Sequence, residues 1–170
     1  MASFLDVFLF ILPSYVSNSI PVELGGGAPL DGGWKWGDRR LLGDGKTVRG
    51  FLAGVSGGTL TGSLMALLYP SPFFSSPQNQ FIASFLLALG TMLGDSIGSF
   101  IKRRLGMAPG KPFILDSILF LFIALLLVYP LTSASLYAPV PLAFLIVLTL
   151  ILHPLFNFLA NRLGMKSVPW

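Results

Sequence analysis

The sequence predicts an all-α integral membrane protein with five transmembrane helices, and three observations lead to this fold class. Hydrophobic residue types make up 54% of the 170 residues and charged types only 11%, whereas a soluble domain carries about 25% charged residues. The few charges are clustered, so that residues 50–94 and 117–161 contain no Asp, Glu, Lys or Arg. Each of these two runs has a Pro- and Ser-rich interruption in its middle. This pattern argues against a disordered chain and against a soluble globular domain.

The first helix is predicted near residues 4–20. The stretch between Asp6 and Glu23 is uncharged and mostly apolar, and it ends in NSIPV, where Asn18 and Pro21 are typical of a helix end. A signal peptide is not indicated, because residues 1–12 contain Asp6 but no Lys or Arg, and no small-residue cleavage site follows.

The two long uncharged runs each predict a hairpin of two spans. A transmembrane helix needs about 20 mostly apolar residues, and Pro and Ser clusters such as PSPFFSSP (70–77) and PLTSASLYAP (130–139) make turns. Together with the first helix, the whole chain (1–170) forms one transmembrane domain. Its expected helices lie near 4–20, 50–69, 79–101, 113–130 and 139–162, with hydrophilic loops at 23–49 and 102–112.

The basic residues predict the orientation. All 11 Lys and Arg residues lie in loop 23–49, in segment 102–112 or in the C-terminal tail, and the other hydrophilic segments contain none. The positive-inside rule places both basic loops and the C-terminus in the cytoplasm and the N-terminus outside, in the cell membrane. A net charge of +4 in so apolar a chain indicates an anionic membrane surface or anionic substrates as partners, and not nucleic acid.

Two rows of glycines recur every fourth residue in the second and third helices. They are Gly50, Gly54, Gly58 and Gly62, and then Gly90, Gly94 and Gly98. Such rows let membrane helices approach closely, so we interpret them as packing surfaces. The two rows face each other or face the fourth helix, and the second and third helices are candidate borders of a groove for lipid.

Two aspartates are the candidate metal ligands. Asp95 lies inside a predicted span, where an ionisable group is costly and indicates function. Asp95, Ser99 and Lys102 share a helix face, so a structural Asp–Lys pair is the alternative interpretation. Asp116 begins the fourth helix after the turn PGKPF. Two carboxylates near one membrane face suit Mg²⁺, which prefers oxygen ligands and completes its shell with waters and phosphates.

The segment GDGKTVRG (43–50) is a candidate phosphate-binding loop. Its glycines expose backbone N–H groups, and Lys46, Thr47 and Arg49 add side-chain donors. The spacing differs from that of a P-loop, and an ordinary basic loop is the alternative. The cluster Lys102, Arg103 and Arg104 is likewise either a phosphate-binding group or a plain inside-positive flank.

Several polar residues have simpler interpretations. His153, Asn157 and Asn161 form a stripe on the fifth helix, which we assign to hydrogen bonds between helices. Asn18 either caps the first helix or donates to a substrate. The chain contains no cysteine, so disulfides, zinc–thiolate sites and cysteine nucleophiles are excluded.

Strings along nearly the whole chain resemble the archaeal CDP-archaeol synthases, relatives of the CDP-diacylglycerol synthases. They are LPSYVSNSIPV, GGAPLDGG, LLGDGKTVRG, LGDSIGSFIKRRLG, the PGKP turn before Asp116, and MKSVPW. The related signature reads G-D…S…K-R, then P-G, then an Asp. One departure is that Leu119 stands where the family's D-Q-x-D-F motif has its second acid.

The resemblance implies a Mg²⁺-dependent enzyme that transfers CMP from CTP to 2,3-bis-O-(geranylgeranyl)-sn-glycerol 1-phosphate, releasing pyrophosphate. Asp95 and Asp116 are then the metal ligands, and Lys46, Arg49, Lys102 and Arg103 hold the phosphates. Asn18, Asp44, Thr47, Ser99 and Arg104 are further candidates for substrate contacts. The alternatives are a phosphatidate-specific enzyme, an anion transporter and a non-catalytic scaffold, and the oligomeric state does not follow from the sequence.

Overall fold

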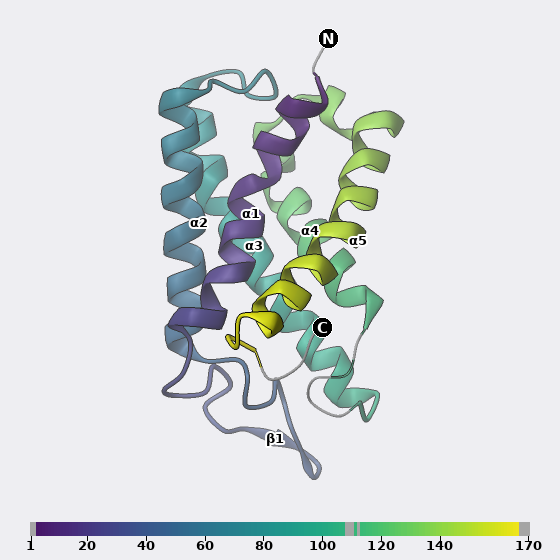
Figure 1. Ribbon diagram of the computed structural model, residues 1–170. Helices are drawn as coiled ribbons and strands as arrows, with labels where there is room; N and C mark the ends of the chain where they lie inside the picture. Colours follow the sequence, from purple (N-terminus) through teal and green to yellow (C-terminus); the bar gives the residue numbers. More distant parts are fainter. Residues whose placement is uncertain (1–2, 108–110, 112, 167–170) are drawn as a thin grey trace.

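The computed structural model describes residues 3–107, 111 and 113–166 and contains five long helices there (Figure 1). Their bounds are α1 Phe4–Leu24, α2 Val48–Leu68, α3 Pro77–Arg104, α4 Ile114–Val128 and α5 Pro139–Arg162. Two short 3₁₀-helices, η1 (Tyr129–Leu131) and η2 (Ala134–Tyr137), join α4 to α5, and a small hairpin of β1 (Lys35–Trp36) and β2 (Arg39–Arg40) lies between α1 and α2. The all-α prediction is confirmed, and the hairpin is an addition to it.

All five helices are long and apolar enough to cross a membrane, with α4 counted together with η1 as Ile114–Leu131. Successive helices run in opposite directions (Figure 1). The C-terminal ends of α1, α3 and α5 therefore meet the N-terminal ends of α2 and α4, and we call this the basic end. The loop that carries the β hairpin also lies there.

Two helices are longer than predicted. α1 continues through Pro21 to Leu24, although Pro21 has no N–H for the carbonyl of Ser17. That carbonyl instead lies against α2, where a Cβ added to Gly54 would be 2.8 Å from it. α3 extends to Arg104, so the basic cluster predicted to begin loop 102–112 forms the last turn of the helix.

The glycine rows bring helices into close contact, as the packing interpretation predicted, but the rows do not face each other. A Cβ on Gly58 of α2 would lie 2.8 Å from Ala88 of α3 and 2.8 Å from a carbonyl of α1. A Cβ on Gly94 of α3 would lie 2.5 Å from the backbone of Leu119 in α4. Neighbouring helices fill both rows, so the glycines themselves serve as packing surfaces.

The end remote from the basic end is closed by its two loops, which are the predicted turns at 70–77 and 130–139. Phe73 is 1% exposed, and its carbonyl accepts a hydrogen bond of 2.8 Å from the backbone N–H of Ser133. Tyr69 donates to Asp6 at 2.7 Å, which ties this end to α1. The largest fully buried side chains of the core are Ile11, Phe73, Leu87, Phe120, Leu136 and Leu145.

Candidate active site

Asp31 organises the loop between α1 and α2. Its carboxylate is 1% exposed and accepts hydrogen bonds from Arg40 at 2.5 Å and from the backbone N–H of Leu42 at 2.9 Å. Burial alone would raise the pKa of Asp31, but these bonds and the Arg40 charge outweigh burial and hold the pKa below its ordinary value. A buried, ionised carboxylate thus fixes a loop that has little core of its own.

The first Lys–Asp pair joins this loop to α3. Backbone hydrogen bonds align residues 28–30 with 46–48, including Leu30 N–H to the Lys46 carbonyl at 2.8 Å. Lys46 then donates through Nζ to Oδ2 of Asp95, and the two side chains are 23% and 20% exposed. Thr47 caps α2, because its hydroxyl accepts from the N–H of Gly50 at 3.1 Å. The loop therefore positions Lys46 next to Asp95, one of the predicted metal ligands.

The second pair joins α3 to α4. Lys102 Nζ donates to Asp116 Oδ2 at 2.5 Å, and both side chains are less than one-fifth exposed. A Cβ on Gly98 would lie 3.0 Å from the other Asp116 oxygen, so glycine leaves room for this carboxylate against α3. α3 thus supplies the acid of one pair, Asp95, and the base of the other. The alternative interpretation, an ion pair between Asp95 and Lys102 within α3, is therefore wrong.

The two carboxylates fit Mg²⁺. The Oδ1 atom of Asp116 is buried and has no hydrogen-bond partner among the described residues. Within that part of the chain His, Asp and Glu form no group of three or more able to enclose a metal ion. Mg²⁺ is usually held by one or two carboxylates together with substrate phosphates and waters, so this sparse, oxygen-only donor set is appropriate for it.

Two of the predicted arginines support the hairpin loop. Arg104 donates to the carbonyls of Trp36 and Arg40, both at 2.9 Å, and its guanidinium lies 5.6 Å from the centre of the Trp36 ring. Arg103 is buried at the end of α3, where its side chain would lie 3.6 Å from a Cβ added to Gly43. The basic cluster therefore anchors the loop to α3.

The other predicted residues are part of neither Lys–Asp pair. Asp44 is 87% exposed and pairs with Arg40 at 2.7 Å, and Arg49 is exposed and has no ion pair within the described ranges. Ser99 is buried on α3. Of the PGKP turn only Lys111 is described, and the last four residues of MKSVPW also lie outside the described residues.

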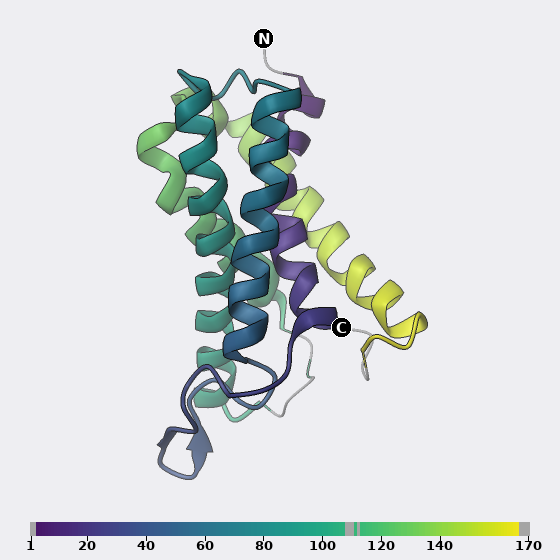
Figure 2. The same cartoon turned by 90° about the vertical axis from the view of Figure 1, so that its left-hand side faces the viewer.

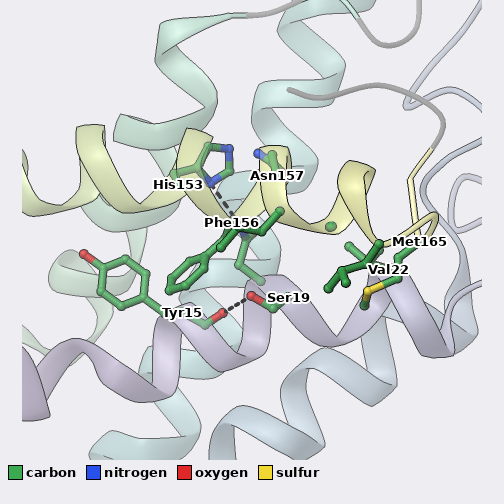
Figure 3. A pocket seen from close by; sticks show the side chains of 11 residues that line it. Tyr15, Ser19, Val22, His153, Phe156, Asn157 and Met165 are labelled. Atoms are coloured by element: carbon green, nitrogen blue, oxygen red, sulfur yellow. Dashed lines mark hydrogen bonds between the residues drawn. The ribbon is translucent and has the colours of Figure 1, made fainter.

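Asn18 belongs to a separate pocket between α1 and α5, with a volume of about 280 Å³. Figure 3 shows side chains of both helices pointing into it, and Asn18 Nδ2 lies 3.2 Å from His153 Nδ1. The stripe on the fifth helix thus makes the predicted contact between helices through His153. The lining residues are Tyr15, Asn18, Ser19, Val22, His153, Phe156, Asn157, Leu159, Ala160, Leu163 and Met165.

Lys166 is a charged residue that the predicted site does not include. It follows α5, and its Nζ donates to Asn157 of the pocket wall at 2.8 Å. Burial lowers the pKa of Lys166, and so does the positive charge of Lys46, while Asp95 and Asp116 act in the opposite direction. Lys166 therefore shares an electrostatic environment with both Lys–Asp pairs. The sequence signal for this position was Gly164, because a glycine directly after a helix often ends it and turns the chain back.

The chain is similar to known proteins over nearly its whole length. A family model described as CarS-like CDP-archaeol synthase matches residues 1–170. A CDP-archaeol synthase of Thermococcus gammatolerans is 48% identical over 163 residues, which cover 95% of this chain and 93% of that protein. One of Pyrococcus furiosus is 46% identical over the full length of both chains. A solved structure, described as an intramembrane enzyme for archaeal membrane lipid biosynthesis, superposes with a TM-score of 0.77 at 36% identity and covers 91% of this chain and 94% of that one.

Proposed function

The chain belongs to the CDP-archaeol synthase family, and we propose that its reaction, the CTP-dependent formation of CDP-archaeol, takes place at the two Lys–Asp pairs of the basic end. The observation that carries this assignment is the position of α3. It joins both pairs, through Asp95 and Lys102, at the end of the bundle where the loop and helix termini gather positive charge. The resemblance predicted from the sequence is confirmed by the family match.

The reaction needs no protein nucleophile. An oxygen of the lipid phosphate forms a bond to the α-phosphorus of CTP, the bond from that phosphorus to the β-phosphate oxygen breaks, and pyrophosphate leaves. The obstacle is repulsion between two polyanions, so positioning and positive charge supply the catalysis. Lys46 and Lys102 provide that charge from the loop and from α3, and Arg49 is exposed in the first turn of α2.

Asp95 and Asp116 are the residues that would hold Mg²⁺. When bound, the ion neutralises charge on the phosphate oxygens. The lysines orient both carboxylates, because each lysine donates a charge-assisted hydrogen bond to Oδ2. The Oδ1 atom of Asp116 stays available for coordination, which supports this role.

The lipid substrate is an ether-linked phosphate, 2,3-bis-O-(geranylgeranyl)-sn-glycerol 1-phosphate, and the basic end faces the cytoplasm. The first assignment rests on the family, whose members make CDP-archaeol. The second rests on the positive-inside rule, since the basic loops lie at the same end as the pairs. CTP is a cytoplasmic metabolite, which agrees with this orientation.

Removal of either carboxylate charge tests the site. Asp95→Asn and Asp116→Asn keep the side-chain shape, and each should reduce CDP-lipid formation by about 100-fold or more, the usual effect of removing one electrostatic contact to a transition state. The measurement is transfer of label from CTP to the ether-lipid phosphate in detergent with Mg²⁺. A parallel reaction with phosphatidate tests lipid selectivity, and ether-lipid turnover should exceed it.

Asp38→Asn is the matched control, since Asp38 lies exposed in the hairpin turn and loses the same charge. It should keep wild-type turnover. Near-normal activity of Asp95→Asn would remove the proposed role of this carboxylate. Equal or faster turnover of phosphatidate would overturn the ether-lipid assignment.

A further inference from the structure

We propose that the β hairpin lies in the head-group layer of the membrane and docks on anionic lipid head groups. The contact surface consists of Trp34, Lys35, Trp36 and Arg39, which we call the hairpin patch. The inference concerns a surface outside both Lys–Asp pairs and does not rest on the proposed function. It assigns a partner to an element that the sequence did not predict.

The hairpin patch carries two large, uncovered aromatic side chains. Trp34 and Trp36 are 73% and 66% exposed. Trp34 extends the hairpin ladder, because its carbonyl accepts from the N–H of Leu41 at 3.0 Å, and residues two apart in an extended chain point to the same side. The antiparallel register pairs Trp36 with Arg39. One side of the hairpin thus combines two indole rings with a guanidinium. Indole has an apolar ring and a polar N–H, and it is enriched where the bilayer meets water.

The length of α3 places the hairpin at head-group depth. α3 has 28 residues and is therefore about 42 Å long. The hydrocarbon core of a bilayer is about 30 Å thick, and the whole bilayer with its head groups is about 40–45 Å thick. The last turn of α3 consequently lies in the head-group layer. The ring of Trp36 packs on Phe100, one turn before the helix ends at Arg104, with the ring centres 6.2 Å apart.

The hairpin patch also continues the bilayer-facing surface of α3. Leu93 and Ile97 are exposed on one face of this helix, and Phe100 and Arg104 follow on the same face. The Arg104 guanidinium lies 5.4 Å from the centre of the Phe100 ring and 5.6 Å from that of Trp36. Figure 2 shows the hairpin beside the end of α3, on the side remote from α5. The surface that contacts lipid chains therefore passes directly onto Trp36.

The charges of the hairpin patch match an anionic surface. Lys35 and Arg39 are exposed, and neither belongs to an ion pair among the residues that the structure describes. Arg39 donates only to a carbonyl, that of Arg103, at 3.3 Å. Asp38 in the turn between the strands is the one acid of residues 34–39, so this segment has one net positive charge. Basic side chains at this depth are attracted to anionic head groups.

Docking of the hairpin restrains the rest of the loop. The N–H of Trp34 donates to the carbonyl of Asp31 at 3.0 Å, and the carboxylate of Asp31 holds Arg40 of β2. The N–H of Leu30, the residue before Asp31, bonds the Lys46 carbonyl. The hairpin is thus joined by short-range bonds to the segment that carries Lys46. A contact of the hairpin patch with the membrane surface therefore limits how far this segment can move.

The emission of the hairpin tryptophans tests the proposal. The chain has three tryptophans, and Trp170→Phe leaves only Trp34 and Trp36. The full chain is placed in detergent and in lipid nanodiscs, whose two faces are both open to water. The nanodiscs contain phosphatidylcholine alone or with phosphatidylglycerol. Phosphatidylcholine brominated on its acyl chains should quench the emission, and acrylamide should quench it less than in detergent. Adding phosphatidylglycerol should raise the ratio of shielded to accessible tryptophan about fivefold, the effect of one net charge.

Lys35→Gln separates the charge from the aromatic rings. This substitution removes an exposed cation, brings the net charge of residues 34–39 to zero and should abolish the effect of phosphatidylglycerol. Arg162→Gln is the matched control, because Arg162 is exposed at the end of α5 and its loss changes the net charge of the chain equally. This control should keep the full effect. Both substitutions are made together with Trp170→Phe.

Three results would overturn the proposal. Strong acrylamide quenching in nanodiscs without quenching by brominated lipid would place the hairpin in water. An equal effect of phosphatidylglycerol in Lys35→Gln would contradict the attraction to anionic head groups. Tryptophans already shielded from acrylamide in detergent would show that a second copy of the chain covers the hairpin patch. None of these measurements depends on CDP-lipid formation, so they are independent of the proposed function.

Discussion

α3 and α5 end at the same face of the bundle but differ in how closely they pack against the other helices. Half of the apolar window of α3 is buried, compared with 11% of that of α5. The glycines of α3 lie directly on the backbone of α4, whereas α5 is joined to α1 through side chains, such as the hydrogen bond of 2.9 Å between Tyr15 and Thr149. The tightly packed helix carries the ion pairs, and the loosely packed one forms the pocket. The two helices therefore differ in how much of their apolar surface is left to contact the bilayer.

The largest expected effect comes from disrupting the tight contact. In Gly94→Ala the new Cβ would lie 2.5 Å from the Leu119 carbonyl and the Phe120 Cα, which are backbone atoms that cannot move alone. We expect a loss of about 3 kcal/mol in stability, at the upper end for overpacked sites, and a lower yield of folded protein in detergent. Thermal unfolding monitored by circular dichroism measures it.

Gly57→Ala is the matched control on α2. Its Cβ would meet only the Ile20 side chain, at Cδ1 and Cγ1, and this flexible side chain can rotate away. This variant should unfold within a few degrees of the wild type. If Gly94→Ala were equally stable, the contrast between backbone-packed and side-chain-packed helices would be wrong.

A smaller effect is expected on the α5 side. Thr149→Val removes the partner of the buried Tyr15 hydroxyl while keeping the volume of the side chain. Hydrogen bonds between membrane helices contribute about 0.6 kcal/mol on average, so the unfolding temperature should fall only slightly. Because this bond joins α5 to α1 and leaves the packing of α3 on α4 intact, the unfolding temperature should fall much less than in Gly94→Ala. A fall as large as that of Gly94→Ala would contradict the contrast between the two helices.

The smallest effect concerns the loop outside both helices. The folded-state pKa of Asp31 is below its ordinary value, so its ionised form stabilises the loop at neutral pH. This contribution is complete above the ordinary aspartate pKa of about 3.9 and is lost as the pH falls through the lower, folded-state value. The protection factor of the Leu42 amide, its hydrogen-exchange rate relative to that of an unfolded amide at the same pH, should therefore fall only in acid. In Asp31→Asn the protection factor should already be low at neutral pH, and an unchanged value in that variant would contradict the role of the carboxylate.

Local composition predicted the helices but not the partners of the charges. Apolar runs between charge clusters are enough to predict five spans, because a helix within the bilayer satisfies its backbone hydrogen bonds internally. The pairing of Lys46 with Asp95 spans 49 positions of sequence and depends on how a loop folds over α3. The periodicity of α3 placed Asp95 and Lys102 on one face, yet each finds its partner on another element.

The periodicity of the sequence likewise did not predict where Lys166 lies. Its position follows from one glycine turn and two asparagines, which as a stripe on a helix indicated only contacts between helices. The buried carboxylate of Asp31 had no signal beyond its place in a glycine-rich loop, since the residues that bond it, Arg40 and Leu42, are brought near by the hairpin.

The hydrogen bond between Phe73 and Ser133 fastens the bundle at the end remote from the ion pairs, while α5 splays at the other. The segment that joins α4 to α5 is therefore a fixed pivot. A change in the inclination of α5 displaces its C-terminal end most, and that end already stands apart from α2 and α3 (Figure 2).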